Sequence, residues 1–220
     1  MPPSSSSVLV KICGINSPAA ADAVLRAGAD FGGLVFFAKS PRNLGFEIGV
    51  ALAERMRGKL KLAALVVDAD DQMLGRIADE IKPDFFQLHG KETPARAVEI
   101  HARFGIPLIK ALPVAEPGDL ARAADYDMAQ MILFDAPSVP AATRPGGHGV
   151  AFDWQMLKGA NPKQPWFLAG GLNPENVARA IAVSGARLVD VSSGVESAPG
   201  VKNAALIEAF VTAARARVAA

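Results

Sequence analysis

Short apolar runs alternate with longer helix-forming stretches along almost the whole chain, and this alternation constrains the fold more than any other feature. The apolar runs are rich in β-branched or aromatic residues, whereas the stretches between them carry Ala, Leu, Arg and Glu. Strands that alternate with helices at this spacing form βαβ units and therefore a parallel sheet. The eight expected strands occupy residues 8–14, 31–37, 61–68, 84–90, 106–113, 130–136, 165–171 and 187–194.

Start and stop signals mark several of the expected helices. Ser17 and Asn173 each place a capping side chain directly before a proline, which is typical of a helix start. Glycines at 28, 105 and 185 fall where helices are expected to end. The expected helices include Pro18–Ala27, Phe46–Arg57, Asp71–Ile81, Pro94–Phe104, Pro174–Val183 and Ala204–Arg215.

Eight strands and about eight helical stretches predict an α/β fold, a single (β/α)8 TIM barrel. We expect the barrel to span residues 8–220, because no linker-like change of composition divides the chain. Residues 1–7, rich in Pro and Ser, are expected to be a disordered N-terminal tail. The alternative architecture, an open doubly wound sheet, usually has fewer strands.

Composition excludes several classes of function. The formal net charge of +1 gives no support for binding to nucleic acid or to a membrane surface. A single cysteine excludes a disulfide framework and a multi-thiolate zinc site, and the three histidines have no ligand-like spacing, so no metal is expected. No secretion signal or apolar run of ~20 residues is present, which favours a cytoplasmic location. Monomer and homodimer both remain open.

The residues that suit chemistry gather where expected strands end. In a (β/α)8 barrel, function belongs to the carboxyl ends of the strands and to the loops that follow them. Cys13 ends the first strand, Arg42 follows the second, His89 ends the fourth and Asp135 ends the sixth. Gly170 and Gly171 follow the seventh strand, and the eighth strand ends with Asp190, Ser192, Ser193 and Gly194.

Strand alternation predicts a buried ion pair beside the cysteine. Side chains at i and i+2 share a face of a strand, so Lys11 and Cys13 point the same way, into the barrel. By the same count Asp190 points inward from the last strand, which is adjacent to the first once the barrel closes. Because a buried ammonium group needs a partner, we expect Lys11 to pair with Asp190.

Two segments have the character of phosphate-binding loops. In "LAGGLNPENV" a glycine pair precedes a capped helix, where backbone N–H groups and the helix dipole favour an anion. In "VDVSSGVESAPG" small residues and a glycine follow the last strand and suit a short extra helix. Phosphate bound between the loops after strands 7 and 8 is a recurrent barrel arrangement, so a sugar phosphate is the favoured small-molecule ligand.

Seven motifs together resemble the phosphoribosylanthranilate isomerase family from about residue 8 to residue 220. They are "VKICGI", "GLVFFAKSPRNL", "FFQLHG", "ILFDA", "FDW", "LAGGLNPENV" and "VDVSSGVE…PGVK". The resemblance implies a (β/α)8 barrel of tryptophan biosynthesis. It also implies an Amadori rearrangement of N-(5-phosphoribosyl)anthranilate that needs no cofactor.

The resemblance also implies a role for each matching residue. Asp135 matches the general acid, Cys13 the general base, and Arg42 the ligand of the anthranilate carboxylate. His89 and Asp190 match positions that contact the substrate. The glycines and serines of the two loops, Gly170, Gly171, Ser192, Ser193 and Gly194, match the phosphate site.

Competing interpretations remain for single residues and for the whole chain. Cys13 alone would be interpreted as a buried hydrophobe, Asp135 as a cap, Arg42 as a solvated charge, and His89 as a partner of backbone groups. The loop at 137–151 is either a mobile lid or an ordered Ω-type loop. Ribulose-phosphate epimerases need a set of metal ligands that this sequence does not have. The histidine-pathway isomerase resembles two fused half-barrels, but the ends of the first and fifth strands, "KICG" and "KALP", differ here. A non-catalytic barrel would not need both Cys13 and Asp135.

Overall fold

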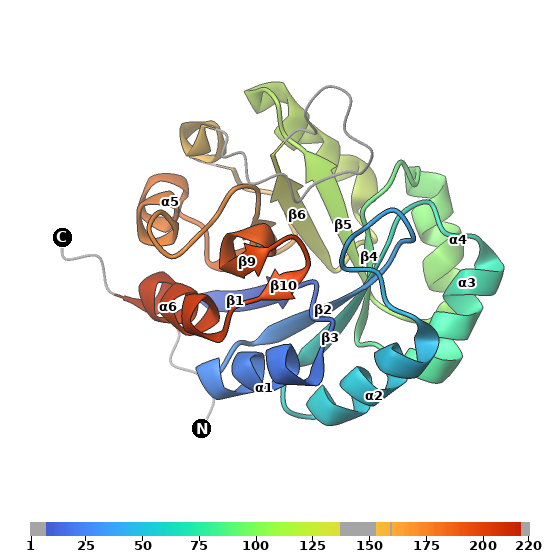
Figure 1. Ribbon diagram of the computed structural model, residues 1–220. Helices are drawn as coiled ribbons and strands as arrows, with labels where there is room; N and C mark the ends of the chain where they lie inside the picture. Colours follow the sequence, from blue (N-terminus) through green and yellow to red (C-terminus); the bar gives the residue numbers. More distant parts are fainter. Residues whose placement is uncertain (1–7, 137–152, 159, 217–220) are drawn as a thin grey trace.

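Eight parallel strands close into a barrel in the computed structural model, which describes residues 8–136, 153–158 and 160–216 (Figure 1). Each strand pairs with its sequence neighbours, and β8 pairs with β1, which confirms the expected (β/α)8 fold. The expected tail at 1–7 and the whole of the loop at 137–151 lie outside the described residues. The strands are β1 Leu9–Cys13, β2 Phe31–Phe36, β3 Lys61–Val66, β4 Phe85–Leu88, β5 Leu108–Pro113, β6 Met131–Asp135, β7 Trp166–Leu168 and β8 Leu188–Val191.

Helices pack around the outside of the barrel (Figure 1). The α-helices are α1 Pro18–Ala27, α2 Phe46–Met56, α3 Asp71–Arg76, α4 Pro94–Phe104, α5 Val177–Ser184 and α6 Ala204–Arg215. The shorter or tighter ones are η1 Ile77–Ile81, a π-helical turn, and the 3-10 helices η2 Pro117–Tyr126, η3 Trp154–Leu157 and η4 Ser193–Val195. A small hairpin, β9 Glu196–Ala198 with β10 Val201–Lys202, follows η4.

The capping chemistry expected from the sequence is present at both ends of the helices. The Ser17 hydroxyl accepts a hydrogen bond from the Ala20 N–H at 3.2 Å. The glycines that stop α1, α4 and α5 all have left-handed backbone angles, with φ of 72°, 67° and 73°. Asn173 caps its turn as expected, but α5 begins only at Val177, because residues 174–176 form a turn.

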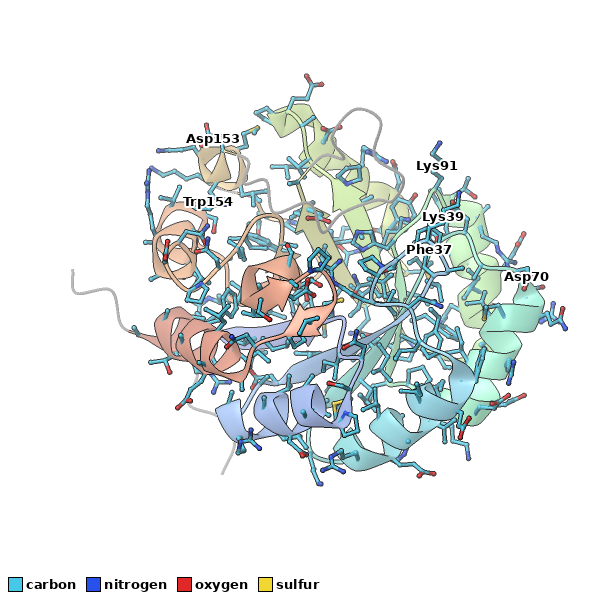
Figure 2. All side chains as sticks on the ribbon, viewed as in Figure 1. Phe37, Lys39, Asp70, Lys91, Asp153 and Trp154 are labelled. Atoms are coloured by element: carbon cyan, nitrogen blue, oxygen red, sulfur yellow. The ribbon has the colours of Figure 1, made fainter. Side chains whose placement is uncertain are left out.

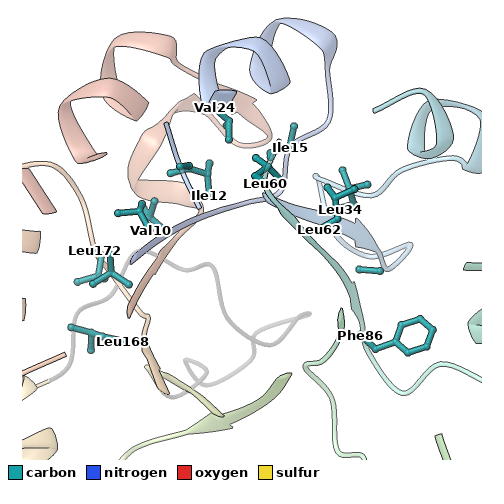
Figure 3. Packing of buried hydrophobic residues seen from close by; sticks show 14 of the residues in the cluster. Val10, Ile12, Ile15, Val24, Leu34, Leu60, Leu62, Phe86, Leu168 and Leu172 are labelled. Carbon is teal, nitrogen blue, oxygen red and sulfur yellow. The ribbon is translucent and has the colours of Figure 1, made fainter. Parts of the chain in front are cut away.

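Strand alternation separates two apolar layers. Val10, Ile12 and Phe86 lie on the outer side of the barrel wall and turn toward the helices (Figure 3). The interior is filled by a smaller cluster in which the rings of Phe31 and Phe167 meet edge to face at 5.3 Å. The interior is therefore packed, and polar side chains such as Gln87 and Asp190 lie toward the carboxyl ends of the strands.

No helix in the described part of the chain is long and apolar enough to cross a membrane.

Candidate active site

A pocket at the carboxyl ends of the strands brings the predicted site residues together. It contains about 700 Å³ of space, open solvent at its mouth included. Phe37, labelled in Figure 2, lines it from the loop after β2. All the predicted site residues except Gly194 line it as well, namely Cys13, Arg42, His89, Asp135, Gly170, Gly171, Asp190, Ser192 and Ser193.

The expected ion pair between β1 and β8 lies directly beneath the pocket. Lys11 and Asp190 are register partners, and the Lys11 Nζ donates to Asp190 Oδ1 at 2.8 Å. The Lys11 side chain is fully buried. Its burial lowers its pKa, but Asp190 and then Cys13 raise it by more, so that the pKa lies above its ordinary value. Lys11 is therefore a permanent cation under the floor of the pocket.

The Cys13 thiol is buried next to this cation. A Cβ on Gly33 would lie 2.9 Å from the Cys13 Sγ and 3.2 Å from the Lys11 Nζ, so these two groups fill the space beside a residue that has no side chain. Burial raises the pKa of Cys13, and the nearby Lys11 ammonium opposes the rise without cancelling it. In the ligand-free protein the thiol is therefore the main form at neutral pH.

A chain of three polar side chains enters the pocket from β4 and β6. The Nε2 of His89 lies 3.2 Å from Asp135 Oδ2, and the Nδ1 lies 3.1 Å from the Gln87 amide nitrogen. With that amide donating to Nδ1, the His89 proton sits on Nε2 and points at Asp135. The Ala136 N–H donates to the other oxygen of Asp135 at 2.9 Å. Asp135 is thus held in place from two sides while it lines the pocket.

The loops after β7 and β8 are locked against each other. A Cβ on Gly194 would lie 1.9 Å from the Leu172 carbonyl oxygen, so only glycine allows this approach. The backbone N–H groups of Gly171 and Ser193 donate to no other described residue. Two close loops with unused donors are an arrangement that suits an anion. Gly194, although it does not line the pocket, holds the two loops together.

Arg42 reaches the pocket from the loop after β2 but is already engaged by another residue. Its Nε and Nη2 donate to the two carboxylate oxygens of Glu196 at 2.7 and 2.8 Å. The predicted bidentate edge for a substrate carboxylate is therefore occupied on one side. The other edge, formed by Nη1 and the second N–H of Nη2, has no hydrogen bond among the described residues.

Sequence reasoning missed two residues of the site, Gln87 and Glu196. Gln87 shares a face with Phe85 and His89, so the alternation used for β1 also predicts that it points inward. Its side chain is fully buried, and its amide oxygen has no partner among the described residues. Glu196 lies in the motif "SSGVE", but no periodicity indicates where a side chain in such a loop points.

No cluster of three His, Cys, Asp or Glu side chains suited to a metal ion occurs among the described residues.

Comparison with known proteins identifies the family. A profile described as "N-(5'phosphoribosyl)anthranilate (PRA) isomerase" matches residues 10–213. A protein of that name from Parvibaculum lavamentivorans is 50% identical over 212 residues, which cover 95% of this chain and 99% of the relative. The crystal structure of the Thermotoga maritima phosphoribosyl anthranilate isomerase is 35% identical with a TM-score of 0.84, and the match covers 94% of this chain and 98% of that one. Another phosphoribosyl anthranilate isomerase, crystallised with reduced 1-(o-carboxyphenylamino)-1-deoxyribulose 5-phosphate, is 32% identical with a TM-score of 0.80 and the same coverage. The chain therefore belongs to the N-(5'-phosphoribosyl)anthranilate isomerase family.

Proposed function

We propose that this protein converts N-(5-phosphoribosyl)anthranilate to 1-(2-carboxyphenylamino)-1-deoxyribulose 5-phosphate, the isomerisation of tryptophan biosynthesis, with Asp135 as general acid and Cys13 as general base. The observation that carries the proposal is the placement of a thiol and a carboxyl group at the ends of β1 and β6, facing one pocket. The pocket also has groups suited to an anion on two sides, Arg42 and the loops after β7 and β8.

The reaction needs two proton transfers at neighbouring atoms. Asp135 gives its proton to the furanose ring oxygen, and the bond between that oxygen and C1 breaks as the anthranilate nitrogen forms a Schiff base with C1. The Cys13 thiolate then takes the proton from C2, and the electron pair moves to form an enolamine. The enolamine tautomerises to the ketone, so the product has the same atoms as the substrate.

The two groups differ in what surrounds them. His89 and the Ala136 N–H keep the Asp135 carboxyl in one orientation, which fixes where it meets the ring oxygen of the substrate. Cys13 is mostly protonated in the ligand-free protein, so the reaction proceeds through its minor thiolate form. The Lys11 ammonium beside it makes that form more accessible than burial alone would allow.

The remaining site residues bind the two anionic ends of the substrate and its sugar. Arg42 takes the anthranilate carboxylate through its unused edge, since a guanidinium group presents five N–H donors in a planar array. The loops with Gly170, Gly171, Ser192 and Ser193 take the phosphate through their N–H groups and hydroxyls. His89 and Asp190 contact the sugar between these ends, and Gly194 keeps the phosphate loops in place.

The experiment is an assay of substrate turnover, followed by the decay of substrate fluorescence, with Cys13→Ser and Asp135→Asn. Each variant should lose on the order of 10²–10⁴ in kcat, the usual contribution of a positioned acid or base. Asp127→Asn is a matched control, because Asp127 is exposed and pairs with Lys163 on the surface. Turnover within twofold of the parent protein in either catalytic variant would refute its assigned role. No turnover by the parent protein would refute the function itself.

A further inference from the structure

Glu196 is a buried carboxylate at the edge of the pocket that the proposed chemistry does not use. It begins β9, and its side chain is only 4% exposed. Besides the two bonds from Arg42, it accepts hydrogen bonds from the Lys202 Nζ at 2.7 Å and from the Gly200 N–H at 3.1 Å. One carboxylate therefore receives four donors, two of them from the residue that faces the substrate.

The ion pair with Glu196 determines the orientation of the Arg42 guanidinium group. A guanidinium group is planar, and a side-on pair with a carboxylate fixes both its plane and its direction. Because Nε and Nη2 point at Glu196, the opposite edge of the guanidinium points away from Glu196, and Arg42 lines the pocket. The long Arg42 side chain, only 6% exposed, is thus held in one orientation before any ligand binds.

We propose that Glu196 is a positioning residue that orients the guanidinium of Arg42 for the carboxylate of the substrate and so determines the affinity for carboxylate-bearing substrates. This inference rests on the proposed function. It deepens that function, because it assigns carboxylate recognition to a pair of residues rather than to Arg42 alone.

Lys202 connects the same carboxylate to the phosphate side of the pocket. Its Nζ donates to the Ser192 carbonyl oxygen at 2.9 Å as well as to Glu196. Glu196 therefore lies between Arg42, which faces the carboxylate subsite, and Lys202, which contacts the phosphate loop. Burial alone would raise the pKa of Glu196, but hydrogen bonds from Arg42 and the charge of Lys202 lower it to about 2. The carboxylate is consequently ionised whenever the enzyme is assayed near neutral pH.

The test is Glu196→Gln in the full-length protein, with kcat and KM for N-(5-phosphoribosyl)anthranilate measured separately. Gln keeps the size of Glu but faces one Arg42 donor with an amide N–H, so the side-on pair cannot form. We expect KM to rise at least tenfold while kcat stays within threefold. Inhibition by inorganic phosphate, which probes the phosphate loops alone, should weaken by much less than KM rises, because Lys202 keeps its bond to the Ser192 carbonyl oxygen. Glu99→Gln is the matched control, because Glu99 also pairs with an arginine, Arg96, but is 67% exposed on α4.

A second set of variants, made in the Arg42→Met protein, distinguishes a positioning role of Glu196 from a purely structural one. In Arg42→Met, adding Glu196→Gln should raise KM no further, because the residue through which Glu196 acts is gone. An equal rise in that background, a loss of kcat at unchanged KM, or an equal weakening of phosphate inhibition would overturn the proposal. If Glu196→Gln does not fold, Glu196→Asp replaces it. The shorter side chain should displace the guanidinium and raise KM, and an unchanged KM would overturn the proposal.

An inactive parent protein would refute the proposed function, whereas an active parent with an unaffected Glu196→Gln variant would refute this inference alone.

Discussion

Acidification should remove a defined part of the stability of this protein through Glu196. In the folded protein the pKa of this carboxyl is about 2, compared with an ordinary value of 4.5. A group whose pKa is lower in the folded state stabilises that state above the unfolded pKa and loses its contribution as pH falls toward the folded pKa. The contribution should therefore be complete above about pH 5 and should disappear progressively between about pH 5 and pH 2.

The size of the effect follows from the same two values. At about 1.4 kcal/mol for each pH unit, the gap between 4.5 and about 2 corresponds to about 3 kcal/mol of unfolding free energy. Glu196 as a residue is only partly buried, so solvent screening makes this figure an upper value. A contribution of this size is a large fraction of the ~5–15 kcal/mol that usually stabilises a folded domain.

The assay is urea unfolding of the parent protein and of Glu196→Gln from pH 7 to pH 3. Other carboxylates titrate in both proteins and cancel in the difference of their unfolding free energies. That difference should be largest at pH 7 and should shrink by about 2 kcal/mol as the pH approaches 3. For Glu99→Gln the difference should stay below about 1 kcal/mol throughout, because an exposed ion pair contributes little. A difference for Glu196→Gln that is the same at pH 7 and pH 3 would refute the reasoning.

Three further predictions concern the floor and the loops of the pocket. Lys11→Met leaves Asp190 buried without its partner and should cost about 3–5 kcal/mol in urea unfolding; a cost below about 1 kcal/mol would contradict the buried ion pair. Gly194→Ala places a Cβ against the Leu172 carbonyl, so the two loops must separate. The inhibition constant of inorganic phosphate should then rise about tenfold or more, which corresponds to about 1.4 kcal/mol of binding free energy. An unchanged constant would show that these loops do not bind the phosphate. Because burial raises the pKa of Cys13, alkylation of this single cysteine by iodoacetamide should quicken about tenfold per pH unit up to pH 9, and a plateau below pH 8 would show that the thiol ionises earlier.

Much of the site was predictable because regular strands leave few choices. The period of two places Lys11, Cys13 and Asp190 on inward faces, and closure of the barrel makes β1 and β8 neighbours. The pair of Lys11 with Asp190, which links residues 179 positions apart, was therefore predicted from periodicity and topology alone, and the structure confirms it. The expected ends of β1 and β6 likewise placed Cys13 and Asp135 at the mouth of the barrel.

The boundaries of some helices were less predictable, because local side chains compete with the helix for backbone groups. Asn173 and Asn176 exchange hydrogen bonds with each other's backbone N–H, and α5 begins only after this turn. After β5 the chain forms the tighter 3-10 helix η2, in which only Ala123 and Tyr126 are buried. Because so few apolar side chains pack here, tertiary contacts do little to stabilise a regular α-helix at this place.

The amino-acid sequence by itself determined the closed barrel, the inward faces of its strands and the rim where the chemistry gathers, because these depend on local periodicity and on the few ways in which βαβ units can close. Only the tertiary structure decided which side chains of different loops meet. Arg42 and Glu196 are 154 residues apart in connections without regular periodicity, and Gln87 contacts His89 in a geometry that depends on Asp135 from another strand. Loop backbones take their course from contacts with the rest of the fold, so the partners of their side chains are defined only when the barrel has formed.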